Sequence, residues 1–447
     1  SGRALSEFCG VLQMPSPLSP PSSRATFLPA WALAALVGVV GFCFASFEPL
    51  GAIVCVGLIA VGLQLYVWMT QRSLLYLPDA GSRRPSENPP GLRSPEERDL
   101  PFREVYIRAA DRVKIQMWWL HNPEATCSVI YFHGGAGNIG HNLPVIEGLF
   151  SKCKANVLAV EYRGFGVSVV FDDVTEEGLL KDAQAAHDWY RQQELNDLPL
   201  VLYGKGIGGA VAIGLMKNCL DQSVGVPGMA SAHRPSALVV ENAPCSMAEI
   251  VLSRFPLAKH VRPLLKPPLL FDEWRSERRL GDIGRSSQAP LVQFLCSGND
   301  EVFPPMAHTK RLFRTAMYWM EDTVSLCEFT GGHDDIPIGS EAEKLWSSLN
   351  KFFGKVVDRG LPWLQQVHAA QLAQQAALDA ALASERAKEK AGGKAERARA
   401  ATPPGDAPGE NGTAPSRLAL FCSQCGEKFS NDSAKFCSQC GAKRGGG

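Results

Sequence analysis

The sequence lacks a surplus of charge of either sign. Its 45 lysine and arginine residues are matched by 45 aspartate and glutamate residues, so the formal net charge is zero. Proteins that bind nucleic acid through its phosphates usually carry a basic surplus on one face. The balanced composition therefore argues against nucleic acid as a partner.

The chain also lacks the regular cysteine spacing of a disulfide-stapled protein. Four of its 13 cysteines cluster near the C-terminus, and the other nine are scattered without framework spacing. We interpret these nine as reduced, small apolar residues. With 45% hydrophobic and 20% charged residues, the 447-residue chain suffices for one globular domain with appendages.

Charge is absent from two long apolar runs near the N-terminus. Residues 27–47 and 50–69 contain no charged side chain, and a Glu-Pro dipeptide separates them. Each run has the length of about 20 residues that a bilayer-spanning helix needs. The pattern predicts a transmembrane helical hairpin over 27–69, after an irregular segment over 1–26. One span followed by a re-entrant segment is the alternative.

Basic residues flank the predicted hairpin on both sides. Arg24 precedes it, Arg72, Arg83 and Arg84 follow it, and the turn between the runs carries only Glu48. Because positive residues favour the cytoplasmic side of a membrane, both ends of the hairpin are expected in the cytosol. We therefore expect a membrane protein with two spans whose following domains face the cytosol.

Residues 101–358 alternate short β-branched or apolar runs with helix-like stretches. This alternation is typical of a largely parallel sheet with helices on both faces, an α/β fold. Eight runs are predicted as strands: 104–108, 113–120, 128–132, 156–162, 200–203, 237–241, 291–295 and 324–329.

The remaining segments are predicted from their composition. Residues 70–100 are rich in proline and serine toward their end and are expected to form a linker. Residues 359–400 are rich in Ala, Gln, Glu, Lys and Arg, which indicates a solvated helix. Residues 401–417 are expected to be a disordered linker before a last module at 418–447.

Two glycine-rich strings follow predicted strands. HGGAG begins at His133, and GKGIG spans Gly204–Gly208. Small residues in the first string let backbone N–H groups approach a substrate oxyanion, and Gly135 is placed there. The second string has the glycines of a G-x-S-x-G nucleophile elbow, but Gly206 stands where that motif has serine.

An acid and a histidine follow the last two predicted strands. Asp300 lies in SGNDEV, after the seventh predicted strand, and His333 lies in GGHDD, after the eighth. The order of nucleophile, acid and histidine along the chain is that of an α/β-hydrolase triad. Asp300 and His333 are therefore the predicted acid and base.

The motifs together resemble a known family. LPDAGSR, YFHGGAGNIGH, EYRGFGVS, YGKGIGGAVAI, VVENAP and GGHDD are similar to the membrane-anchored α/β-hydrolase-domain proteins of the Bem-like type, subgroup thirteen. That resemblance covers roughly residues 70–358, and the group is similar to serine hydrolases that act as depalmitoylases and lipid hydrolases. It implies an ester or thioester reaction on an acyl or lipid substrate near the bilayer. By position, it places the nucleophile at Gly206, the acid at Asp300 and the base at His333, with oxyanion N–H groups from Gly135 and Ile207.

The chain departs from this pattern at two points. Gly206 offers no oxygen or sulfur atom for a covalent intermediate. One residue also appears deleted between Gly298 and Asp300. The sequence therefore predicts a catalytically impaired protein or pseudoenzyme. Slow hydrolysis by a water that His333 activates stays open, as does an active serine hydrolase whose nucleophile is altered in this sequence.

A dinucleotide site is a further alternative. The string Gly204-x-Gly206-x-x-Gly209 matches G-x-G-x-x-G between a strand and a helix, and the next strand ends in Glu241. Such glycines let a pyrophosphate approach the helix N-terminus. The acid lies further along the chain than the roughly 20 residues usual for this motif, which weakens this alternative.

The last module carries a repeated cysteine motif. FCSQCG occurs twice and gives C-x₂-C, eleven residues, C-x₂-C. Two such knuckles form a closed tetrahedral site for Zn²⁺, which is structural and supplies the folding energy of so short a module. The predicted zinc ligands are Cys422, Cys425, Cys437 and Cys440. The module resembles zinc ribbons, which usually bind protein or nucleic acid, and a protein is the expected partner here.

Other polar residues in the motifs receive structural interpretations. His133 and His141 flank the first glycine string and are expected to be structural or to line a substrate site. Glu161 and Arg163 are expected to form a structural polar pair. Cys245, in ENAPCS, and the serine after it are not expected to replace the nucleophile, because they lie away from the elbow.

Overall fold

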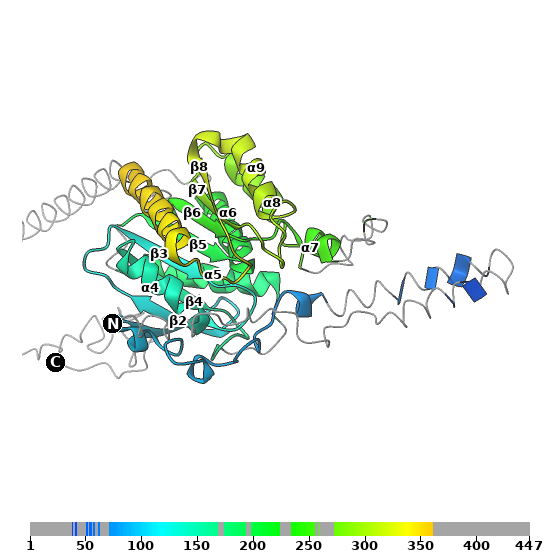
Figure 1. Cartoon of the computed structure of the whole chain (residues 1–447), viewed down its shortest axis with the longest axis horizontal. Coiled ribbons are helices and arrows are strands. Elements are labelled where there is room, and N and C mark those ends of the chain that lie inside the picture. The colour runs from blue at the N-terminus through cyan, green and yellow to red at the C-terminus, as the bar shows by residue number, and fades with distance from the viewer. Residues whose placement is uncertain are drawn as a thin grey trace, which may run out of the picture. The chain divides into compact units, whose positions relative to one another are not determined.

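The computed structural model describes a defined part of the chain (Figure 1). The described residues are 38, 41–42, 51, 53–55, 57–58, 61–62, 71–168, 174–193, 198–223, 234–254, 259 and 272–360. Among them, no helix combines the length and the apolar character that crossing a membrane requires. The predicted hairpin lies mostly outside these residues. The N-terminal segment, the C-terminal linker, the zinc ribbon and all but the start of the solvated helix also lie outside them.

Eight strands form one sheet, which confirms the eight predicted runs. The sheet order is β1-β2-β4-β3-β5-β6-β7-β8. β1 and β2 pair antiparallel, β2 pairs antiparallel with β4, and all other neighbours are parallel. The strands are β1 (Arg103–Arg108), β2 (Lys114–Leu120), β3 (Cys127–Phe132), β4 (Ala155–Glu161), β5 (Leu200–Lys205), β6 (Ala237–Glu241), β7 (Leu291–Ser297) and β8 (Val324–Phe329).

Burial along the strands explains why short apolar runs in the sequence predicted them. Every residue of β3, β4, β5, β6 and β7 is buried, because helices cover both faces of these central parallel strands. β1 lies at an edge of the sheet and is mostly exposed, with alternating half-buried positions. Continuous apolar runs therefore mark the centre of the sheet.

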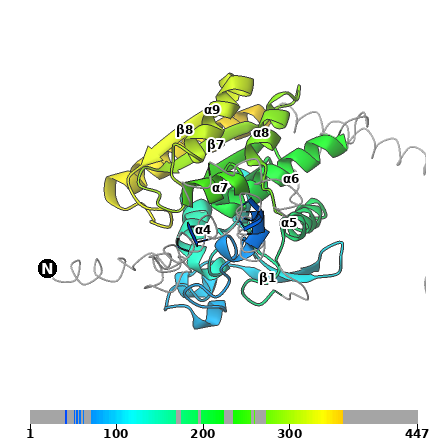
Figure 2. The ribbon, with the colours of Figure 1, turned by 90° about the vertical axis from the view of Figure 1, so that its right-hand side faces the viewer.

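Helices form a layer on each face of the sheet (Figures 1 and 2). One apolar cluster joins the sheet to α5, α6, α7, α8 and α9, and a second joins it to α4 and the helix of residues 339–360. The labelled helices are α4 (Leu143–Ser151), α5 (Glu176–Arg191), α6 (Ile207–Ser223), α7 (Met247–Arg254), α8 (Ser276–Gly284) and α9 (Thr309–Met320). The described residues from 101 to 360 thus form three layers, helix, sheet and helix.

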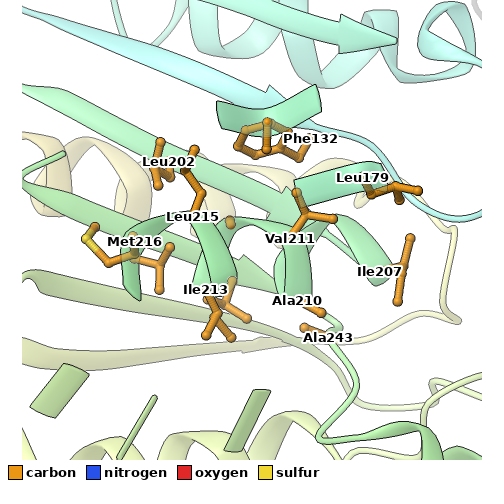
Figure 3. Close-up of a cluster of buried hydrophobic side chains, with 14 of the residues drawn as sticks. Phe132, Leu179, Leu202, Ile207, Ala210, Val211, Ile213, Leu215, Met216 and Ala243 are labelled. Atoms are coloured by element: carbon orange, nitrogen blue, oxygen red, sulfur yellow. The ribbon is translucent and has the colours of Figure 1, made fainter. Parts of the chain in front are cut away.

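Helix α6 connects the core to the elbow. It begins directly after β5 and packs on the strands through small and branched residues such as Ala210, Val211 and Ile213 (Figure 3). These residues are fully buried. Because α6 and β5 are both fixed by this packing, the turn between them has little freedom to move.

The segment expected as a linker makes close contacts with the domain. Residues 71–100 contain only short 3-10 helices, η1 (Arg72–Leu74), η2 (Pro85–Glu87) and η3 (Pro95–Arg98). Leu77 forms a parallel bridge with Ala136 in the first glycine string. Its N–H donates to the Gly135 carbonyl at 2.7 Å, and its own carbonyl accepts from the Gly137 N–H at 3.0 Å. The chain is therefore already fastened to the domain at residue 77.

Candidate functional site

The turn between β5 and α6 has the backbone of a nucleophile elbow. Gly206 has φ of 56°, in the left-handed region that side chains disfavour. Its N–H donates to the Glu241 carbonyl at 2.8 Å, and its carbonyl accepts from the Gly209 N–H at 3.0 Å. A Cβ at Gly208 would lie 2.2 Å from the Phe132 carbonyl oxygen. Glycine is required at 208 because helix and sheet meet there at backbone distance.

The predicted acid and base are hydrogen-bonded to each other. His333 Nδ1 lies 2.8 Å from Asp300 Oδ2, and each residue is 5% exposed. The other Asp300 oxygen accepts the N–H groups of Val302 and Phe303 at 2.9 and 2.7 Å. A carboxylate only accepts, so His333 Nδ1 is the donor in this hydrogen bond, and in the neutral imidazole Nε2 is the acceptor nitrogen. The departure from the family pattern expected before Asp300 is thus compatible with a hydrogen bond between the acid and the histidine.

His333 Nε2 points at the place that a side chain of residue 206 would occupy. A Cβ built on Gly206 would stand 3.2 Å from His333 Nε2. The structure therefore brings Gly206, Asp300 and His333 together in the arrangement of a hydrolase triad without the nucleophile's side chain. The Phe303 ring lies edge-on to the imidazole, at 5.0 Å between centroids, and fixes its plane.

The predicted oxyanion residues, Gly135 in the loop after β3 and Ile207 at the elbow, lie side by side. A Cβ at Gly135 would be 2.0 Å from the Leu75 carbonyl oxygen and 3.4 Å from Ile207 Cγ2. Ile207 is the first residue of α6, where backbone N–H groups have no partner within the helix. Sequence reasoning missed Gly134, whose Cα would be 3.6 Å from a Cβ at Gly206. Its position beside the predicted Gly135 was the only available signal.

An ion pair between buried Lys205 and partly buried Asp334, beside the site, also escaped the sequence reasoning. Lys205 Nζ lies 3.5 Å from Asp334 Oδ1, and the two residues directly neighbour Gly206 and His333. Burial alone would lower the pKa of Lys205, but the Asp334 and Glu241 carboxylates outweigh it and leave that pKa raised. Burial would raise the pKa of Asp334, but Lys205 and His333 outweigh it and leave that pKa lowered. Both groups are therefore charged at neutral pH.

The first histidine of the glycine string is part of the structural framework. His133 is fully buried, with Nε2 3.0 Å from Glu161 Oε1 and Nδ1 2.7 Å from the Gly134 carbonyl oxygen. Glu161 also accepts the Ile139 N–H at 3.0 Å. The expected pair between Glu161 and Arg163 is therefore wrong. The partner of Glu161 is His133, because the side chain of Glu161 turns toward the glycine loop.

Arg163 has two acidic partners of its own. Its guanidinium lies 2.7 Å from both Asp111 and Asp182. His141 is also structural, since its Nδ1 accepts the Asn138 N–H at 3.1 Å. Burial is the main cause that lowers the pKa of His141.

The alternative nucleophiles are engaged elsewhere, as expected. Cys245 is fully buried, its Sγ lies 3.3 Å from the His308 carbonyl oxygen, and burial raises the pKa of its thiol to about 12. Ser246 Oγ accepts the Glu249 N–H in the first turn of α7. Neither side chain is available to the elbow.

The acid of the dinucleotide alternative is also engaged. Glu241 is 6% exposed, and its carboxylate accepts the Tyr203 hydroxyl at 2.6 Å. A Cβ at Gly209 would lie 2.5 Å from Ala243 Cβ, so that glycine makes room for neighbouring protein atoms. Within the described ranges, no group of three or more His, Cys, Asp or Glu side chains has metal-binding geometry. The four predicted zinc ligands lie outside those ranges.

The sheet order, the elbow and the paired acid and histidine define an α/β-hydrolase fold. The chain is 30% identical to protein bem46 of Schizosaccharomyces pombe over 258 residues, which are 57% of this chain and 77% of bem46. It is 27% identical to the α/β-hydrolase domain-containing protein WAV2 of Arabidopsis thaliana over 317 residues, 67% of this chain and 92% of WAV2. The chain belongs to the α/β-hydrolase domain-containing family of bem46 and WAV2, as the resemblance of its motifs implied.

The chain is also similar to a membrane protein of Saccharomyces cerevisiae and to a solved archaeal esterase. The uncharacterized membrane protein YNL320W of Saccharomyces cerevisiae is 27% identical over 261 residues, 58% of this chain and 82% of that protein. A solved esterase of Pyrococcus furiosus aligns with 59% of this chain and 95% of its own, at 18% identity and a TM-score of 0.44. No family model matches the sequence.

Proposed function

We propose that this chain is a catalytically impaired α/β-hydrolase-family protein whose pocket binds an acyl or lipid ligand without forming an acyl-enzyme. The observation that supports the proposal is the missing side chain at Gly206, opposite a histidine that is oriented by Asp300. Covalent hydrolysis needs an oxygen or sulfur atom within hydrogen-bond reach of that histidine. Glycine supplies neither, so the Asp300–His333 pair has no protein hydroxyl to deprotonate.

The remaining chemistry is slow hydrolysis. His333 Nε2 is available to accept a proton from water, and the N–H groups proposed for Gly135 and Ile207 would stabilise the oxyanion. A site without its nucleophile retains roughly 10³–10⁴-fold catalysis over water. The expected substrates are esters or thioesters of acyl chains, the class that the family resemblance implies.

A fluorophosphonate probe tests the proposal. The full chain should not be labelled, Gly206→Ser should be labelled, and Gly206→Ser with His333→Ala should lose the label. Labelling of the unmodified chain at any residue would overturn the proposal. A folded Gly206→Ser protein without label would mean that the pocket itself no longer supports acyl transfer.

The second candidate function is active serine hydrolysis in a form of the protein with serine at 206. The observation in its favour is the 3.2 Å distance between a Cβ at this position and His333 Nε2. A serine hydroxyl there would reach the imidazole after a shift of a few tenths of an ångström. The codon for residue 206 in independent genomic DNA separates the two candidates.

We also propose that residues 27–69 anchor the chain in a membrane. Two uncharged runs of about 20 residues support this, as does the relative from Saccharomyces cerevisiae that is named a membrane protein. The full chain should stay with the membrane pellet after alkaline carbonate extraction. Protease added to the cytosolic side should remove both ends, in accordance with the flanking arginines.

The C-terminal module is proposed to be a zinc ribbon that contacts a protein partner. Its support is the paired C-x₂-C spacing. Metal analysis of the full chain should find one zinc per chain. Cys422→Ser should lose the metal, whereas Ser423→Ala, beside it, should keep it. Retention of zinc by Cys422→Ser would contradict this ligand set.

A further inference from the structure

Exposed aliphatic side chains gather at one edge of the sheet. β3 to β8 are parallel, so the loops after these strands meet at one edge, which we call the site edge because Gly206 and His333 lie on it. Seven large hydrophobic residues between 71 and 360 are exposed in the described part of the chain. Four of them lie in site-edge loops: Val167, Met306, Ile336 and Ile338, which are 41%, 65%, 39% and 67% exposed.

The other three exposed residues are aromatic and lie elsewhere. Tyr106 is on the edge strand β1, beneath Lys114. Tyr318 and Trp319 end α9, which starts at the site edge and leads back to the start of β8, so they lie toward the opposite edge. The Arg285 guanidinium covers Trp319 at 4.3 Å. Among the residues that the structure describes between 71 and 360, the exposed large aliphatic side chains thus all lie at the site edge.

The four exposed aliphatic residues lie on both sides of the candidate site along this edge. Val167 follows β4, Met306 follows β7, and Ile336 and Ile338 follow β8. Gly206, at the end of β5, lies between β4 and β7 in the sheet order. Five strand spacings of about 4.8 Å separate β4 from β8, so the apolar residues span roughly 24 Å of this edge.

The chain that enters the domain arrives at the same edge. Leu75 approaches the glycine loop so closely that a Cβ at Gly135 would lie 2.0 Å from its carbonyl oxygen. The second apolar run ends at Met69, six residues before Leu75. A fully extended chain covers at most about 3.3–3.6 Å per residue, so at most about 20–22 Å of chain separates Leu75, beside the glycine loop, from the end of that run.

We propose that the site edge rests on the lipid bilayer, so that the candidate site at Gly206 faces the membrane. The proposal rests on the membrane anchor proposed above. The short segment from Met69 to Leu75 leads to the end of β3, and the exposed apolar side chains lie after β4, β7 and β8. All of these can contact lipid together only when this edge faces the membrane. Burial of these side chains in the interface is favourable, because apolar surface leaves water. The ligand would then enter from the bilayer as a lipid or a membrane-bound acyl group.

Photocrosslinking in vesicles tests this orientation. The full chain is reconstituted in phosphatidylcholine vesicles, and p-benzoylphenylalanine replaces Ile338, Met306 or Tyr318, one at a time. Lipid adducts are expected at 338 and 306 and none above background at 318, which is 78% exposed and serves as the matched control. Equal adducts at 318 and 338 would overturn the proposal.

Three other outcomes distinguish the lipid contact, the membrane anchor and the orientation. A crosslinked dimer at 338 in place of lipid adducts would assign the edge to a second copy of the chain and overturn the lipid contact. A chain that carbonate extracts from the vesicles would overturn the anchor and this orientation with it. A chain that resists extraction but gives no adduct at 338 or 306 would leave the anchor standing and overturn the orientation alone.

Discussion

A side chain at residue 206 should have a measurable cost in stability. The backbone of Gly206 has φ of 56°, and an L-residue in the left-handed region costs roughly 1–2 kcal/mol. A Cβ there also stands 3.2 Å from His333 Nε2, so the imidazole must shift by a few tenths of an ångström. The hydrogen bond of His333 to Asp300, 2.8 Å long, tolerates such a shift. The left-handed backbone conformation of residue 206 therefore accounts for most of the expected loss in stability.

We expect Gly206→Ala and Gly206→Ser to lower the free energy of unfolding by about 1–2 kcal/mol. For a domain of this size, 1 kcal/mol corresponds to a change in Tm of about 2–4 °C, so Tm should fall by roughly 2–8 °C. Thermal unfolding of the detergent-solubilised full chain, followed by circular dichroism, measures the shift. Serine and alanine should differ little, because both carry the Cβ that meets the strained backbone.

A matched glycine supplies the control. Gly354 lies in the helix of residues 339–360, and a Cβ built there meets nothing within 4 Å. Gly354→Ala should therefore raise the unfolding free energy by roughly 0.5–1 kcal/mol. Gly206→Ala that is as stable as the parent would refute the left-handed turn and with it the elbow on which the proposed function depends.

Three further predictions concern residues around the site. Lys205→Met should lower the free energy of unfolding by about 1–3 kcal/mol at pH 7, because it removes the ammonium partner of the partly buried Asp334 carboxylate. The pKa of Lys205 is raised and that of Asp334 is lowered, so the ion pair stabilises the fold between about pH 4 and 10 and is progressively lost outside this range. The difference in unfolding free energy between Lys205→Met and the parent, measured in urea, should therefore be smaller at about pH 3 than at about pH 7. An unchanged difference would argue against the ion pair. Gly135→Ala should displace the segment at Leu75, because the new Cβ would meet the Leu75 carbonyl oxygen. That segment should then be cleaved by protease faster than in the parent. Equal rates of cleavage would contradict this prediction. Burial raises the pKa of the Cys245 thiol to about 12, so this residue should not react with iodoacetamide at pH 8 until the chain unfolds. Peptide mapping by mass spectrometry measures the modification. Modification of Cys245 in the folded protein would contradict its burial.

The sequence by itself determined the strands and the order of the site residues. Central parallel strands are buried on both faces, so each appears as a short apolar run, and the run at 237–241 matches β6 at both ends. Connections in such a fold place the loops after parallel strands at one edge. The positions of Gly206, Asp300 and His333 after their strands therefore predicted their meeting.

Only the tertiary structure decided which polar groups pair. Glu161 and Arg163 are two residues apart in the sequence, but Glu161 faces His133 and Arg163 faces Asp111 and Asp182. Partner choice depends on which face of the backbone each side chain leaves and on which strands become neighbours. Sequence spacing contains neither.

The same reason explains the residues that the sequence did not reveal. Lys205 and Asp334 lie on different loops and meet because β5 and β8 end at the same edge. Leu77 joins the glycine loop through backbone hydrogen bonds, which leave no pattern in side-chain composition. Local propensity therefore fixed the strands and the elbow, whereas long-range packing fixed the ion pairs and the contact between the entering chain and the site.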